Sequence, residues 1–125
     1  MHNKINAVLD KIESKLSSDD ILKFEIRVTE NDLCKDDDYP NYHKGVLIAV
    51  GKNRDIIQAK KDLVKLFKSK SDLVEKCMNP NDETDDNRAV KLYIIVRFNL
   101  MEQIPMVDLQ IVHLDLFDFA QIELD

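Results

Sequence analysis

Cys34, His43 and Cys77 are the residues whose types could form a nucleophilic or metal-binding site. A thiolate at Cys34 with His43 as its base would need positive surroundings, and the carboxylates at 36–38 supply the opposite charge. A zinc site needs about four ligands, and no Cys-x-x-Cys pair is present to supply two of them. Cys77 falls on the apolar face of a predicted helix, which is typical of a small core residue. We therefore expect no catalytic cysteine and no metal.

His113 and Asp115 lie two residues apart, so a regular strand would place them on the same side as an acid–base pair. No third group can be assigned beside them, which favours a half-exposed histidine near a carboxylate. Phosphate-binding loops need several glycines, and the chain has only Gly45 and Gly51. A calcium loop starting at Asp82 would have Tyr93 where a bidentate glutamate is required. The sequence thus predicts no cofactor and no enzyme.

The charge of the chain is acidic and unevenly distributed. Eighteen Lys and Arg against 24 Asp and Glu give a net charge of -6, which repels nucleic-acid phosphates. Residues 52–76 are nevertheless rich in lysine, and no Lys or Arg follows Arg97. Two acidic clusters fall in predicted loops, at residues 30–38 and 82–86. Either these clusters are solvated surface, or they form a docking surface for a basic partner.

Apolar periodicity predicts most of the secondary structure. Spacings of three and four predict an amphipathic helix over residues 3–16, and alternation predicts strands at 24–28 and 88–99. The apolar run Gly45–Gly51 is typical of a strand in the interior of a sheet. Asn53 is a candidate cap for a following helix, and residues 54–78 form one long helix or two joined near 68–71. Residues 30–44 lack any pattern and form a long loop.

The last part of the chain is apolar on both faces. A bend near 111–113 would let a strand after Pro105 keep its core face. Phe117, Phe119, Ile122 and Leu124 are expected to pack as a final strand or a short helix, because a free tail would leave four large side chains in water. The element order predicts an α+β, two-layer sandwich with two helices on one face of a mostly antiparallel sheet of four or five strands. This order, α-β-β-α-β-β, could be a permuted ferredoxin-like topology.

Length and composition bound the class of protein. The 125 residues favour one domain over residues 1–125, and 44% hydrophobic with 34% charged residues favours a folded chain. No apolar run approaches the roughly 18 residues of a membrane span, and no leader is apparent before Ile5. Two cysteines cannot form a disulfide framework, so we expect a cytoplasmic protein with no membrane partner.

These observations favour a non-enzymatic, protein-binding domain. The leading interpretation is an inhibitor or immunity-type factor that docks on a basic protein partner. Tyrosines among carboxylates combine anchors with electrostatic steering, and the residues expected at that contact are Asp36, Asp37, Asp38, Tyr39 and Tyr42. The alternative is a dimeric secretion-type chaperone or phage-like assembly component. In that case the second face of strand 88–99, with Tyr93 and Ile95, would form a homodimer contact.

Overall fold

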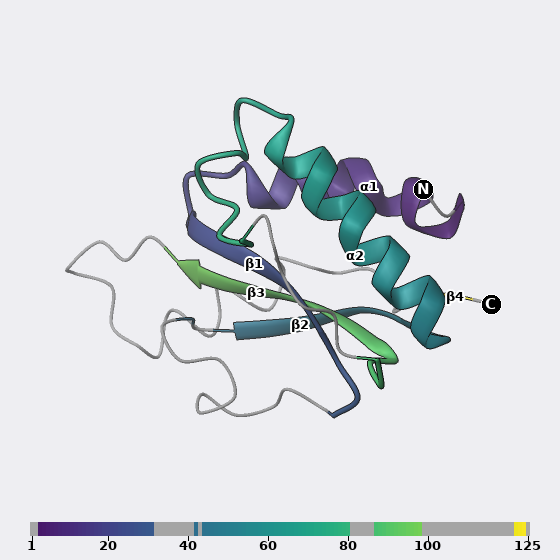
Figure 1. Ribbon diagram of the computed structural model, residues 1–125. Helices are drawn as coiled ribbons and strands as arrows, with labels where there is room; N and C mark the ends of the chain where they lie inside the picture. Colours follow the sequence, from purple (N-terminus) through teal and green to yellow (C-terminus); the bar gives the residue numbers. More distant parts are fainter. Residues whose placement is uncertain (1–2, 32–41, 43, 81–86, 99–121, 125) are drawn as a thin grey trace.

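The structure, a computed structural model, describes residues 3–31, 42, 44–80, 87–98 and 122–124 (Figure 1). Within them two helices and four strands confirm the predicted α+β class. Their bounds in chain order are α1 (Asn3–Leu16), β1 (Ile21–Thr29), β2 (Lys44–Gly51), α2 (Asn53–Lys68), β3 (Lys91–Phe98) and β4 (Ile122–Leu124).

The four described strands form one mixed sheet in the order β1-β3-β2-β4. β3 runs antiparallel to both of its neighbours, with Ile94 opposite Ile26 on β1 and opposite Val46 on β2. β4 runs parallel to β2, which places Ala49 opposite Ile122. The parallel pair makes the sheet mixed, and β2 occupies the interior position expected from its continuous apolar run.

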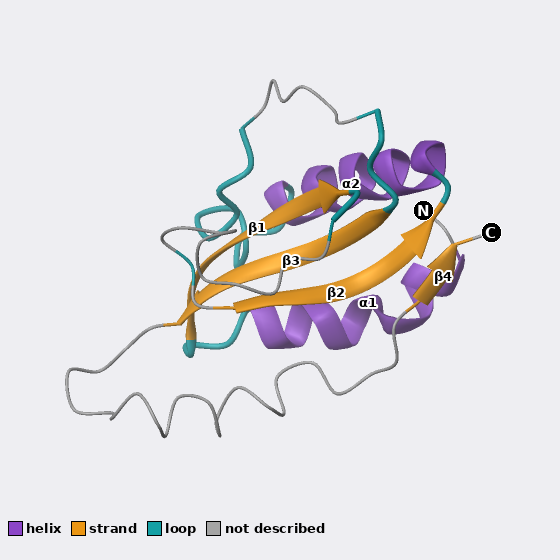
Figure 2. Cartoon of the chain, turned by 90° about the horizontal axis from the view of Figure 1, so that it is seen from below, coloured by secondary structure: helices purple, strands orange, loops and turns teal. Residues whose placement is uncertain are grey.

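Both helices pack on the same face of this sheet. Figure 2 shows the sheet from its other face, with the helices behind the strands. Each helix buries the apolar stripe that its three-and-four spacing creates, with Ile12 of α1 and Leu63 of α2 fully buried. Phe24 of β1 meets Phe67 of α2 edge-to-face, with ring centroids 5.5 Å apart and an interplanar angle of 88°. The main core therefore lies between the two helices and the inner face of the sheet.

Two predictions about α2 are wrong in detail. The helix ends at Lys68, where the two-helix alternative placed a break, but residues 69–76 form turns and a bend rather than a second helix to 78. The physical reason is that this segment leaves the helix to pair with β1, where Lys76 O accepts from Phe24 N and Met78 N donates to Phe24 O. Asn53 is the first residue of α2 rather than its cap, and its Nδ2 donates to Ala89 O at 2.9 Å.

Neither described helix is long and apolar enough to cross a membrane. The predicted bend at 111–113, as well as Phe117 and Phe119, lie outside the described residues. Of the four apolar residues expected in a last element, Ile122 and Leu124 do belong to a strand, β4.

Candidate functional site

The strand β1 presents charged side chains on the sheet face opposite the helices. Phe24 and Ile26 point into the main core, and the alternation of a strand turns Lys23, Glu25 and Arg27 to the other side, where they are partly exposed. Arg27 Nη2 lies 3.2 Å from Glu25 Oε2, which forms an ion pair along the strand. We call this side of the sheet the outer face.

Tyr42 packs against these β1 residues. The ammonium of Lys23 lies 5.0 Å from the centroid of the Tyr42 ring, a distance at which a cation is attracted to an aromatic face. The Tyr42 hydroxyl also hydrogen-bonds the Glu25 side chain. Lys23, Glu25, Arg27 and Tyr42 therefore form one connected group, which we call the Tyr42 cluster.

The electrostatics of the cluster keep Tyr42 protonated. Burial is the largest of the causes that raise the pKa of its hydroxyl from 10.0 to about 12, and the nearby negative charge of Glu25 and its hydrogen bond act in the same direction. The positive charge of Arg27 lowers the pKa and opposes part of this effect. The phenol donates its hydrogen bond to the Glu25 carboxylate, which sets its orientation.

The centre of the outer face is apolar. Ile95 of β3 lies between Glu25 of β1 and Gly45 of β2, and Tyr93 lies between Arg27 and Leu47. Tyr93 is 5% exposed and Ile95 is fully buried, although neither belongs to the main core. Both side chains are thus already covered within a single chain.

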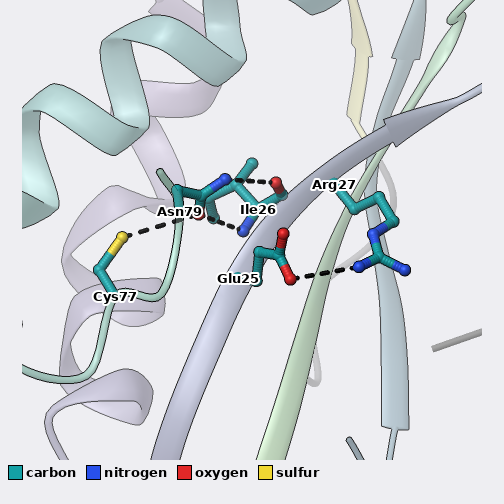
Figure 3. A network of polar contacts seen from close by, with 5 residues as sticks. All are labelled: Glu25, Ile26, Arg27, Cys77 and Asn79. Carbon is teal, nitrogen blue, oxygen red and sulfur yellow. Dashed lines mark hydrogen bonds and ion pairs between the residues drawn. The ribbon is translucent and has the colours of Figure 1, made fainter. Parts of the chain in front are cut away.

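Behind β1, the buried side chain of Asn79 holds the strand from its edge (Figure 3). Asn79 Oδ1 accepts from Ile26 N at 2.8 Å, and Asn79 Nδ2 donates to Ile26 O at 2.8 Å. The Cys77 thiol lies 3.7 Å from the same Oδ1 and is buried in the core, as its sequence position predicted. Because β1 carries Glu25 and Arg27 on one side and this clamp on its edge, the clamp fixes the strand that positions the Tyr42 cluster.

The groups that the described residues of the outer face bring together are charged and aromatic side chains. Within the described part of the chain, no three His, Cys, Asp or Glu side chains come together as metal ligands. Cys77 is the one described cysteine, and its thiol lies near the side-chain oxygen of Asn79. What the described outer face offers is an anchored tyrosine with charges of both signs around it.

Of the residues predicted at the partner contact, the structure describes Tyr42. Asp36, Asp37, Asp38 and Tyr39 lie outside the described residues, as do Cys34, His43, His113 and Asp115. Sequence reasoning missed Lys23, Glu25 and Arg27 as neighbours of Tyr42. Alternation had assigned Glu25 and Arg27 to the exposed side of the strand, but no local signal connects them to a residue some 15 positions away.

Known proteins add no assignment. The chain matches no protein-family model, no curated protein and no solved structure.

Proposed function

We propose that this chain is a small protein-binding domain that docks on a basic surface of another protein, as an inhibitor or immunity-type factor. The contact residues proposed are Asp36, Asp37, Asp38, Tyr39 and Tyr42. The observation that carries the proposal is the Tyr42 cluster, which anchors a tyrosine four residues after three consecutive aspartates.

Anchoring matters because ordering a side chain costs free energy on binding. Lys23 and Glu25 already hold the Tyr42 ring and hydroxyl, so a partner would meet a tyrosine that has lost part of its rotational freedom. Tyrosine is also among the residue types that contribute most to protein interfaces. A preorganised tyrosine beside carboxylates therefore supplies both an anchor and a charge.

The distribution of charge supports a docking role for the acidic segments. Thirteen of the 24 acidic residues lie in the ranges 32–38, 82–86, 102–118 and at 125, and Lys35 is the only base among them. A surface kept charged for solubility alone would intersperse both signs. Segregated carboxylates instead favour fast, salt-sensitive association with a cationic surface.

A dimeric chaperone or assembly component is less favoured by the described geometry. That function would use Tyr93 and Ile95 as a contact between chains, and both are already buried within one chain. The partner-binding proposal asks for no such rearrangement.

The test begins with the protein purified from its native cells, with co-purifying proteins identified by mass spectrometry. The association rate of an identified partner is then measured for the wild type and for the variant Asp36→Asn, Asp37→Asn, Asp38→Asn. We expect the variant to associate about tenfold more slowly at low salt, with the difference vanishing at high salt because exposed charges are screened.

The matched control removes three carboxylates from the other acidic cluster, as Asp82→Asn, Asp85→Asn, Asp86→Asn. It changes the net charge by the same amount, so the two variants differ only in the position of the lost carboxylates. If the contact is at 36–42, the control should slow association much less. Equal slowing in both variants would show that only total charge matters. A salt-resistant homodimer with no bound partner would instead favour the chaperone or assembly function.

A further inference from the structure

The strand β4 occupies a site built from the outer edge of β2 and the first turn of α1. Its three residues pair with Ala49, Val50 and Gly51 in parallel. Leu124 is 3% exposed and belongs to the main core, whereas Glu123 is exposed. From α1, Lys4 Nζ donates to Glu123 O at 2.8 Å. We call this site the β4 socket.

Gly51 shapes the socket by having no side chain. A Cβ at this position would lie 2.5 Å from Leu124 O and 2.9 Å from Leu124 Cβ, closer than atoms can approach. The backbone of the entering strand thus fills the space that a larger residue would take. Recognition depends on this close approach, on the burial of Leu124 and on the bond from Lys4 to a main-chain carbonyl.

We propose that the β4 socket also binds the β4 strand of a second copy of this chain, so that two copies exchange this strand. The socket holds its occupant through three consecutive residues, so a strand from another copy would reproduce the same pairing, burial and hydrogen bond. Exchange of an identical element between copies costs little, because each interaction that a strand leaves in its own chain forms again in the other.

The length of the connection allows the exchange. β4 pairs with the end of β2 that lies beside the beginning of β3, so the chain must return along the length of β3, roughly 25 Å, to reach it. Residues 99–121 provide the connection, and a segment of that length can extend to roughly 75 Å. The socket of a neighbouring copy therefore lies within reach of the same strand.

Within one chain the tethered strand competes strongly, since a tether turns its binding into an intramolecular step with an effective concentration that can reach about the millimolar range. The test removes this competition with two full-length variants. Gly51→Val places a side chain where the backbone of β4 lies, so the socket is blocked while the β4 sequence is unchanged. Leu124→Asp puts a charge at the buried position of β4, so the strand no longer fits while the socket is unchanged. Neither variant can fill its own socket, yet the strand of the first fits the socket of the second.

We expect each variant alone to be monomeric and an equimolar mixture to give a heterodimer in light scattering after size exclusion. Far-UV circular dichroism and a cooperative urea transition would establish that both variants fold. A mixture of two folded variants that stays monomeric would overturn the proposal. So would a dimer of either variant alone that is as abundant as the heterodimer, because its contact would then lie elsewhere.

A second measurement covers the case in which Gly51→Val does not fold. A fluorescently labelled peptide of residues 119–125 is titrated with the full-length Leu124→Asp chain, and its anisotropy is recorded. Saturable binding of this peptide, together with at least tenfold weaker binding of a control peptide carrying Leu124→Asp, supports the socket. Absence of binding to the folded chain, or equal binding of both peptides, contradicts it.

Discussion

The side-chain amide of Asn79 pairs with both backbone groups of Ile26, in the way that a residue of a neighbouring strand would. Its oxygen accepts from Ile26 N and its nitrogen donates to Ile26 O, each at 2.8 Å. Immediately before it, Lys76 and Met78 bond the two backbone groups of Phe24, each at 2.9 Å. Residues 76–78 and the side chain of Asn79 thus extend the sheet beyond β1. They cover part of an edge that would otherwise be a template for pairing with other chains.

Replacing Asn79 by alanine should therefore destabilise the protein strongly. The change leaves the amide and carbonyl of Ile26 without these partners in a buried place, at a cost of about 2 to 4 kcal/mol for two groups. Urea denaturation should show a lower midpoint with an unchanged slope. Asn87→Ala is the control, because Asn87 is exposed and its loss should cost less than about 0.5 kcal/mol. Equal midpoints for the two variants would refute the role given to the clamp.

Tyr42 should lose its proton at a higher pH than an ordinary tyrosine. Its pKa of about 12 in the folded protein exceeds the value near 10.0 of an unfolded tyrosine. Between these values the folded state binds more protons than the unfolded state, so this group's contribution to stability is complete below pH 10 and is lost as the pH rises toward 12. The difference in ultraviolet absorbance between the wild type and Tyr42→Phe isolates this tyrosine from Tyr39 and Tyr93 during alkaline titration.

Glu25→Gln tests the cause of that shift. Removing the carboxylate charge should lower the Tyr42 pKa toward 10.0, while the part due to burial remains. Glu30→Gln is the matched control, because Glu30 is exposed near the end of the same strand and does not contribute to the Tyr42 shift. If both substitutions move the titration equally, general charge rather than the Glu25 contact sets the pKa.

Lys76 should stabilise the end of α1. Its Nζ donates to Leu16 O, the last carbonyl of α1, at 3.3 Å and to Ser18 O, which also accepts from Ile21 N, at 2.8 Å. Lys76→Met keeps the aliphatic stem and removes the charge, so the free energy of unfolding should fall by about 1 kcal/mol. Lys65→Met on the exposed side of α2 provides the comparison. A loss as large for Lys65 would mean that overall charge, not the cap, is responsible.

Periodicity in the sequence was sufficient for the elements with strong patterns. The apolar stripe of residues 3–16 matches α1 at both ends, and the alternation in 88–99 contains β3 (Lys91–Phe98). These predictions succeed because burial of one face requires a repeat that the order of residues shows directly. The continuous apolar run of β2 likewise indicated an interior strand, since a run without alternation is typical of a strand that is covered on both faces.

Apolar spacing failed where a contact far along the chain decided the local structure. Residues 73–78 keep a helical pattern, yet the backbone at 76–78 pairs with Phe24, because this edge of β1 offers hydrogen bonds that only the tertiary structure brings close. The same holds for Asn79, which looks like a helix stop before Pro80 and is a buried clamp. It holds as well for Tyr42, whose neighbours Lys23 and Glu25 precede it by almost twenty residues.

The sequence by itself therefore determined the class of fold, the amphipathic helix and strand faces and the segregation of acidic charge, since each depends on residue types and short spacings. Only the tertiary structure decided the mixed sheet order, the Asn79 clamp, the Tyr42 cluster and the β4 socket. Each of these joins residues from separate elements, and such contacts depend on where the chain folds back on itself, which no local repeat encodes.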